Sequence, residues 1–330
     1  MAIPRLDKLR YLSLSNTNIK KLHANLVSKI SGLQFLDVSE NALESLDGEA
    51  FAELTNLKSL NLNGNSLNHL EASAFGNLGR LKHLKLQHNN FTYLQSGVFS
   101  GLTELITLDL EGNPLTSIHH LCLMKLHKLK DLSISETLLE SLPEKLFFHL
   151  NSLQRLKLIG NKRLDLGRSR YTFYGLGEMD QLYLSGNAIT ALHGGVFHGM
   201  PRLTLLRLDI NDISFIATDA FSALLQLREL DLSNNEITFL TPSSFSELRH
   251  LTSLNLHRNR IRTIDADSLI GLFNLDVLDL SRNLIERFGE NTFQDNVSLR
   301  VLALQENNLK FLNESTFLHM KGLSHLYLQG

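Results

Sequence analysis

The sequence predicts an α/β solenoid, in which short parallel strands stack on one another and are joined by return segments with little helix. Three observations predict it: a leucine pattern with a fixed step, an asparagine in register with it, and a phenylalanine in the return segment. Successive patterns begin 24 residues apart, as from Leu203 to Leu227. Only the interval from Leu153 to Met179 is longer, at 26 residues. The chain therefore holds about thirteen full repeats and a partial one, and residues 1–330 are expected to form a single domain.

The stretch 227–240, LRELDLSNNEITFL, is typical of every repeat and fits the pattern L-x-x-L-x-L-x-x-N-x-L. Leu230 and Leu232 are two positions apart, so a strand directs both side chains to the same face. Glu229 and Asp231 point to the other face. The leucines are therefore expected in the core, and the alternate residues are expected to be displayed to solvent or to a partner.

An asparagine follows each strand, where the chain turns. Its side-chain amide can donate to and accept from backbone groups that have left the strand ladder, so stacked repeats would form a hydrogen-bonded column. Thr17 and Thr137 replace it in two repeats. The remaining members are Asn41, Asn65, Asn89, Asn113, Asn161, Asn187, Asn211, Asn235, Asn259, Asn283 and Asn307.

The return segments carry a phenylalanine in register, which predicts a stack of buried rings that each contribute roughly 1.5–3 kcal/mol. Val27, Leu123 and Leu269 replace it in three repeats. Cys122 lies one residue before this position, in a slot filled elsewhere by alanine or valine. It is the one cysteine, so we expect a small buried side chain without a disulfide partner.

Repeats of this length with these asparagine and phenylalanine columns resemble the extracellular leucine-rich repeat family of animal cell-surface proteins, which includes Toll-type receptors, chaoptin and connectin. The resemblance covers 9–330 and implies a right-handed horseshoe with a concave parallel sheet and a convex side of loops and short helical turns. It also implies a non-enzymatic, extracellular protein-binding module of a receptor or adhesion protein. The family's cysteine-rich caps are absent, so we expect a fragment cut from a longer protein at both ends.

Composition gives no reason to expect other chemistry. The net charge is −2, which provides no bulk attraction to nucleic acid or anionic lipid. The sequence contains no run of about 18 apolar residues, the length that predicts a membrane-spanning helix. The sequence also lacks a nucleophile elbow, a phosphate-binding glycine loop and a cysteine pair for zinc. We therefore expect neither catalysis nor a cofactor nor a bound metal.

Arginines, a tyrosine and apolar residues fall at display positions of neighbouring repeats, a mixture typical of the centre of a protein interface. The alternative is that a concave sheet tolerates scattered apolar residues. The irregular repeat nearby adds a basic loop with Lys162, Arg163, Arg168 and Arg170, and a weaker patch comprises His83, Lys85 and His88 beside Asp109. The predicted partner-binding residues are Arg155, Lys157, Ile159, Tyr183, Leu205, Arg207 and Ile210.

Three N-x-S/T sequons, at Asn90, Asn296 and Asn313, favour a secreted, glycosylated protein. The family resemblance implies that the full-length protein lies at the outer face of the plasma membrane. Asn296 and Asn313 lie beside turns, so they are expected to be the easier acceptors. The partner would be a protein ligand or a like adhesion molecule. A different class remains open, because leucine-rich repeats also occur in intracellular scaffolds and enzyme inhibitors.

Overall fold

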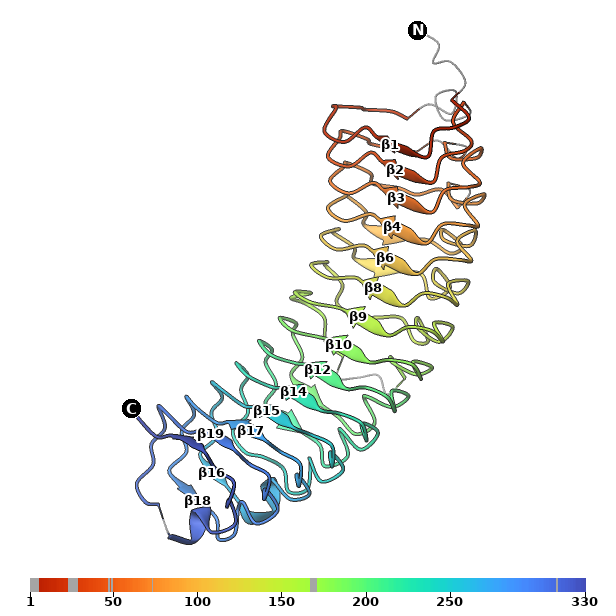
Figure 1. Cartoon of the computed structure of the whole chain (residues 1–330). Coiled ribbons are helices and arrows are strands. Elements are labelled where there is room, and N and C mark those ends of the chain that lie inside the picture. The colour runs from red at the N-terminus through yellow and green to blue at the C-terminus, as the bar shows by residue number, and fades with distance from the viewer. Residues whose placement is uncertain are drawn as a thin grey trace. The chain divides into compact units, whose positions relative to one another are not determined.

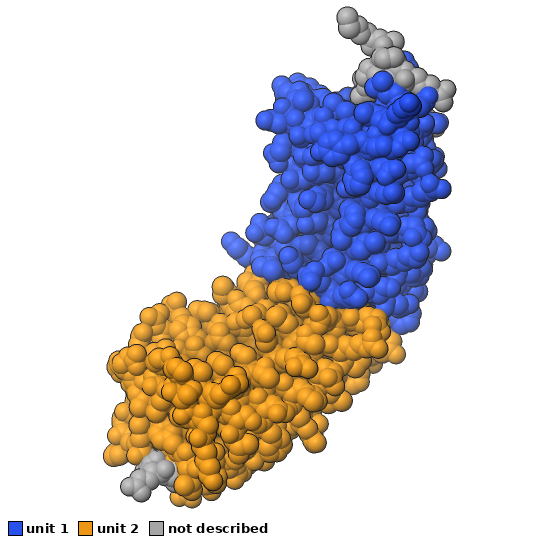
Figure 2. Space-filling model, viewed as in Figure 1, with its two compact units in different colours: residues 1–164 blue, residues 165–330 orange. Residues whose placement is uncertain are grey.

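The computed structural model describes residues 6–22, 29–46, 48, 50–72, 74–166, 171–312 and 314–330. The chain divides into two compact units, residues 1–164 (unit 1) and 165–330 (unit 2) (Figure 2). The division falls inside the irregular repeat, which is the longest one. The expectation of a single domain stays a prediction, and the two units are described separately.

Unit 1 is built from one short strand per repeat, and neighbouring strands pair in parallel with a register of one repeat (Figure 1). Leu84, for example, lies opposite Leu108, which lies opposite Leu132. Tyr93–Leu94 (β5) and Ser117–Ile118 (β7) form a second, two-stranded ladder. The main strands are β1 (Tyr11–Ser13), β2 (Phe35–Asp37), β3 (Ser59–Asn61), β4 (His83–Lys85), β6 (Thr107–Asp109), β8 (Asp131–Ser133) and β9 (Arg155–Lys157).

Unit 2 repeats this architecture, and its described helices are two short 3₁₀ turns, η1 (Ala266–Ser268) and η2 (Glu314–Phe317). The prediction of an α/β solenoid with parallel strands, loops and short helical turns is confirmed. The main strands are β10 (Gln181–Tyr183), β12 (Leu205–Arg207), β14 (Glu229–Asp231), β15 (Ser253–Asn255), β17 (Val277–Asp279), β19 (Val301–Ala303) and β20 (His325–Tyr327). The smaller ladders are formed by β11 (Ala191–Leu192), β13 (Phe215–Ile216), β16 (Thr263–Ile264) and β18 (Arg287–Phe288).

Leucines and phenylalanines fill each unit as the pattern predicts. In unit 1 the rings of Phe51, Phe75 and Phe99 stack with centroids 6.3 Å apart. In unit 2 the rings of Phe221 and Phe245 stack at 5.7 Å. Adjacent strands lie only about 4.8 Å apart. Because the repeats are spaced more widely at the rings than at the strands, each unit curves locally with its strand face on the concave side.

The asparagine column ties each repeat to the one before it. Asn113 is fully buried; its Oδ1 accepts from the backbone N–H of Phe91 at 3.3 Å. Its Nδ2 donates to the carbonyls of Leu86 at 2.9 Å and Leu110 at 2.8 Å. The side chain therefore satisfies the N–H of Phe91 and the carbonyl of Leu110, which would otherwise be buried without this partner.

Candidate functional site

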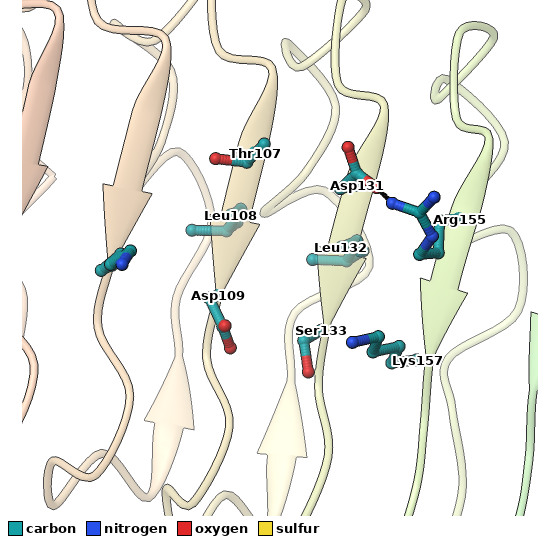
Figure 3. A pocket seen from close by; sticks show the side chains of 9 residues that line it. Thr107, Leu108, Asp109, Asp131, Leu132, Ser133, Arg155 and Lys157 are labelled. Atoms are coloured by element: carbon teal, nitrogen blue, oxygen red, sulfur yellow. Dashed lines mark hydrogen bonds and ion pairs between the residues drawn. The ribbon is translucent and has the colours of Figure 1, made fainter.

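A hollow of about 340 Å³ lies on the strand face of unit 1 and spans β4 to β9 (Figure 3). Thr107 and Ser133 on the middle strands have short side chains, and they leave space between longer side chains on either side. Because alternate residues of a strand point to the same face, these positions follow directly from the register. The hollow is lined by Lys85, Thr107, Leu108, Asp109, Asp131, Leu132, Ser133, Arg155 and Lys157.

The charged groups around this hollow differ in whether they have a partner of opposite charge. Arg155 is ion-paired with Asp131 of the preceding strand (Figure 3). Asp109 accepts hydrogen bonds from Gln87 Nε2 at 2.7 Å and from a backbone N–H at 3.1 Å. Lys85 and Lys157, at opposite ends of the hollow, form no ion pair with any residue that the structure describes. The hollow therefore offers two ammonium groups to an acidic ligand.

On the strand face of unit 2, Arg207 is held by the next repeat. Its Nη1 donates to Asp231 Oδ2 at 2.7 Å, and its Nη2 donates to Glu229 Oε2 at 3.4 Å. The hydroxyl of Tyr183 donates to Gln181 Oε1 at 3.1 Å. These side chains are held in fixed orientations, so a partner would meet a preorganised surface at little cost in side-chain entropy.

Ile210 departs from the residue types that share its position. The residue three positions after each main strand has positive φ in successive repeats. Glycine and asparagine adopt this conformation with little strain. Ile210 has φ +55° and a side chain that is 60 % exposed. A β-branched residue in this region is strained by about 1–2 kcal/mol. Its counterparts are Asn16, Glu40, Gly64, His88, Gly112, Glu136, Gly160, Gly186, Asn234, Arg258, Arg282 and Glu306.

The predicted partner-binding residues divide between the units. Arg155 and Lys157 line the hollow of unit 1 together with Lys85 and Asp109, which the sequence had placed in a separate, weaker patch. Ile159 lies beyond the residues that line it. The hollow itself was not predicted, although its signal was present as two short residues at display positions. The remaining predicted partner-binding residues lie in unit 2 and are Tyr183, Leu205, Arg207 and Ile210.

The basic loop of the irregular repeat is only partly described. Lys162 and Arg163 are exposed, and Arg163 forms a surface ion pair with Glu140 at 3.4 Å. Such an exposed pair contributes little to stability. Arg168 and Arg170 lie outside the described residues. A role of the loop in specificity stays a prediction.

The three sequons differ sharply. Asn90 is exposed, whereas Asn313 lies outside the described residues. Asn296 is fully buried, and its Nδ2 donates to the carbonyls of Leu269 and Leu272 at 3.3 Å each. The expectation that Asn296 is an easy glycan acceptor is therefore wrong for the folded chain, because the nitrogen that would carry the glycan lies in the core.

Cys122 is buried, as expected from its slot. Desolvation raises the pKa of its thiol to about 12, so the thiolate is scarce at neutral pH and the sulfur is a poor nucleophile. Among the described residues there is no group of three or more His, Cys, Asp or Glu side chains placed to hold a metal ion. Nor does any described helix have the length and apolar character needed to cross a membrane.

Comparison with known proteins supports the family resemblance over nearly the whole chain. The leucine rich repeat family model matches residues 7–67, 55–115, 104–162, 169–213, 201–261, 249–306 and 273–330. No curated protein matches the chain significantly, so solved structures carry the remaining comparison.

Three solved structures illustrate the similarity. A chain of the Toll–Spätzle complex from Drosophila is 28% identical with a TM-score of 0.85, over 93% of this chain and 42% of that one. A chain of the TLR13–ssRNA13 complex is 27% identical with a TM-score of 0.82, over 98% and 51%. The Leptospira interrogans protein LIC12759 is 26% identical with a TM-score of 0.76, over 98% and 84%. The chain thus spans about half or less of the first two proteins.

Proposed function

The chain belongs to the leucine-rich repeat family, and from that premise we propose that it is a non-enzymatic, extracellular protein-binding module of a cell-surface receptor or adhesion protein. The partner would bind to the concave strand face. Toll is the precedent for a protein ligand, since a similar chain occurs in complex with Spätzle, while TLR13 occurs in complex with RNA. The net charge of −2 disfavours RNA as the ligand of this chain.

The observation that carries the proposal is the conformation and exposure of Ile210. An exposed isoleucine at positive φ costs the fold free energy, and glycine fills the same position in several other repeats. Strain of this kind is commonly kept at binding sites, where the side chain is used by a ligand. We therefore propose Ile210, in the turn that follows β12, as an apolar anchor, and Tyr183, Leu205 and Arg207 as further contact residues on the strand face of unit 2.

The strand face of unit 1 offers a separate contact of a second type. Lys85 and Lys157 at the ends of the hollow fit acidic side chains of a protein partner, and Arg155 is already oriented by Asp131. The ammonium groups are exposed, so each such contact would contribute modestly to affinity and more to the association rate. The charge pattern favours an acidic segment of the partner at this hollow.

Extracellular exposure is supported by Asn90, whose side chain is accessible to glycosylation. The full-length protein should carry a glycan at this position and reach the cell surface. Secretion of the full-length protein followed by glycosidase treatment checks this. Absence of both the glycan and surface material would favour the alternative of an intracellular scaffold or enzyme inhibitor.

Replacement of Ile210 by glycine tests the binding face. The multimerised chain is screened against arrayed extracellular proteins that include a second copy of itself, and each partner found is measured again with I210G. We expect I210G to raise the free energy of unfolding by about 1 kcal/mol, because strain is relieved, and to weaken binding about tenfold or more. Stability and binding thus move in opposite directions, which misfolding cannot produce.

The Tyr183→Ala and Arg207→Ala double variant should also lose affinity. The matched control is Phe239→Ser, which removes a side chain that is 51 % exposed and lies one repeat after Phe215 of the small ladder, away from the strand face. If F239S abolishes binding while I210G and the double variant retain it, the concave-face proposal is wrong.

A further inference from the structure

A second hollow, of about 270 Å³, lies on the return segments of unit 2, away from the strand face. It spans three successive repeats, and its floor is Gly194 and Gly195. Gly195 occupies the position where the neighbouring repeats carry Tyr171 and Asp219. A repeat without a side chain at this position therefore lies between two repeats whose side chains project from the surface, and the gap between them is a cleft. The lining residues are Tyr171, Tyr174, Gly194, Gly195, His198, Asp219 and Ser222.

The absence of a side chain at Gly194 is needed for this cleft. A Cβ atom there would lie 2.2 Å from Asp219 Oδ1 and 2.3 Å from Oδ2, so the carboxylate lies directly over the glycine. Alanine at this position would push the carboxylate away. Gly194 is thus the sequence feature that leaves room for the acidic group inside the cleft.

The two walls of the cleft have complementary chemistry. On one side the rings of Tyr171 and Tyr174 meet edge to face with centroids 6.5 Å apart, and both side chains are about half exposed. On the other side Asp219 forms no ion pair and accepts no side-chain hydrogen bond among the described residues. Ser222 uses its hydroxyl to donate to the Asp219 carbonyl at 2.9 Å. Aromatic faces and a carboxylate both attract cations.

From this geometry we propose that the cleft binds a guanidinium group, presented by an exposed arginine of a protein partner. A planar guanidinium can stack on a tyrosine ring and donate two hydrogen bonds to a carboxylate, which a lysine ammonium matches less well. The volume is below the roughly 300–1,000 Å³ of pockets that hold drug-sized ligands, and so suits one side chain. This site is on a different surface from the proposed strand-face site and does not depend on it.

The test uses saturation-transfer difference NMR on the whole chain, because the affinity of one exposed side chain will be weak. The probes are N-acetylarginine methylamide and its neutral citrulline analogue. We expect the arginine probe to bind more tightly, and Asp219→Asn to weaken its binding about fivefold, the effect of one exposed ion pair. Asp212→Asn is the matched control, since it removes the same charge from another exposed aspartate of unit 2.

Three results would overturn the proposal. The first is equal binding of the arginine and citrulline probes, and the second is an equal effect of D219N and D212N on arginine binding. The third uses methyl glucoside as an additional probe: if it binds, the arginine probe does not, and D219N removes the saccharide signal, the cleft is a sugar site. Thermal unfolding of both variants verifies that any loss of binding is local.

Discussion

Asn113 in unit 1 and Asn296 in unit 2 are both fully buried, yet their side-chain amides differ in hydrogen bonding. Asn113 has partners for both its oxygen and its nitrogen. Asn296 donates through Nδ2, but its buried Oδ1 accepts no hydrogen bond from the part of the chain that the structure describes. The two residues share a type and a degree of burial, so we expect hydrogen-bond partners, and not burial alone, to decide whether a buried amide stabilises the fold.

The position of Asn296 explains its poor surroundings. It lies one repeat after Leu272, which lies one repeat after Leu248, so it occupies a slot that neighbouring repeats fill with a buried leucine. A polar side chain has replaced an apolar one in the core. Asn113, by contrast, lies beside backbone groups that leave the strand ladder and need a partner.

Asn113→Leu should produce the largest effect. It leaves the N–H of Phe91 and the carbonyl of Leu110 buried without their side-chain partner, and each such group costs about 1–3 kcal/mol. We expect the free energy of unfolding to fall by about 3 kcal/mol, measured by urea denaturation. A loss below about 1 kcal/mol would contradict the structural role assigned to the column.

Cys122 extends the comparison to an ionisable group in an apolar slot. Burial raises its thiol pKa from 9.0 to about 12 in the folded chain. The protonated thiol is favoured by folding, so this contribution is fully present below pH 9 and is lost as pH rises toward 12. The loss is about 1.4 kcal/mol per pH unit.

The stability difference between the chain and Cys122→Ala should therefore shift by about 2 kcal/mol against the cysteine form between pH 8 and about pH 10.5. Urea denaturation of both proteins at the two pH values measures it. An unchanged difference would mean that the thiol is not desolvated in the folded chain.

Asn296→Leu should have a smaller effect of opposite sign. It restores the residue type of the slot and removes the unpartnered oxygen. The carbonyl of Leu269 loses its side-chain donor, whereas that of Leu272 still accepts from the N–H of Leu275. The two gains outweigh this loss, so we expect the free energy of unfolding to rise by about 1 kcal/mol. Urea denaturation beside N113L makes the contrast direct, since the same substitution stabilises at one site and destabilises at the other. A loss of stability in N296L would show that the Asn296 side chain is better satisfied than its contacts indicate.

Much of the fold was predictable because every repeat carries the same pattern of core positions. The constant step identified Leu84, Leu108 and Leu132 as core residues, and the structure buries all three. The same register, applied to the return segment, could have placed Asn296 in a leucine slot. The sequon at Asn296 was instead interpreted from its turn-rich flanks, which is a local signal that carries no information about burial.

The candidate sites were less predictable, because they depend on side chains that are far apart in the sequence. The display positions of Arg155 and Arg207 followed from alternation along a strand. Their ion pairs with Asp131 and Asp231 depend on which side chains stand opposite in the neighbouring repeat. The hollows arise where short residues, such as Ser133 or Gly194, lie between longer ones.

By itself, the sequence determined the solenoid, its core and the direction of each strand residue, because apolar alternation with period two and a constant step leave one way to stack the repeats. The tertiary structure decided which displayed groups are paired, whether a buried amide oxygen has a hydrogen-bond donor and where the surface is hollow. These properties depend on contacts between one repeat and the next, where side-chain length and charge vary and no periodic rule applies.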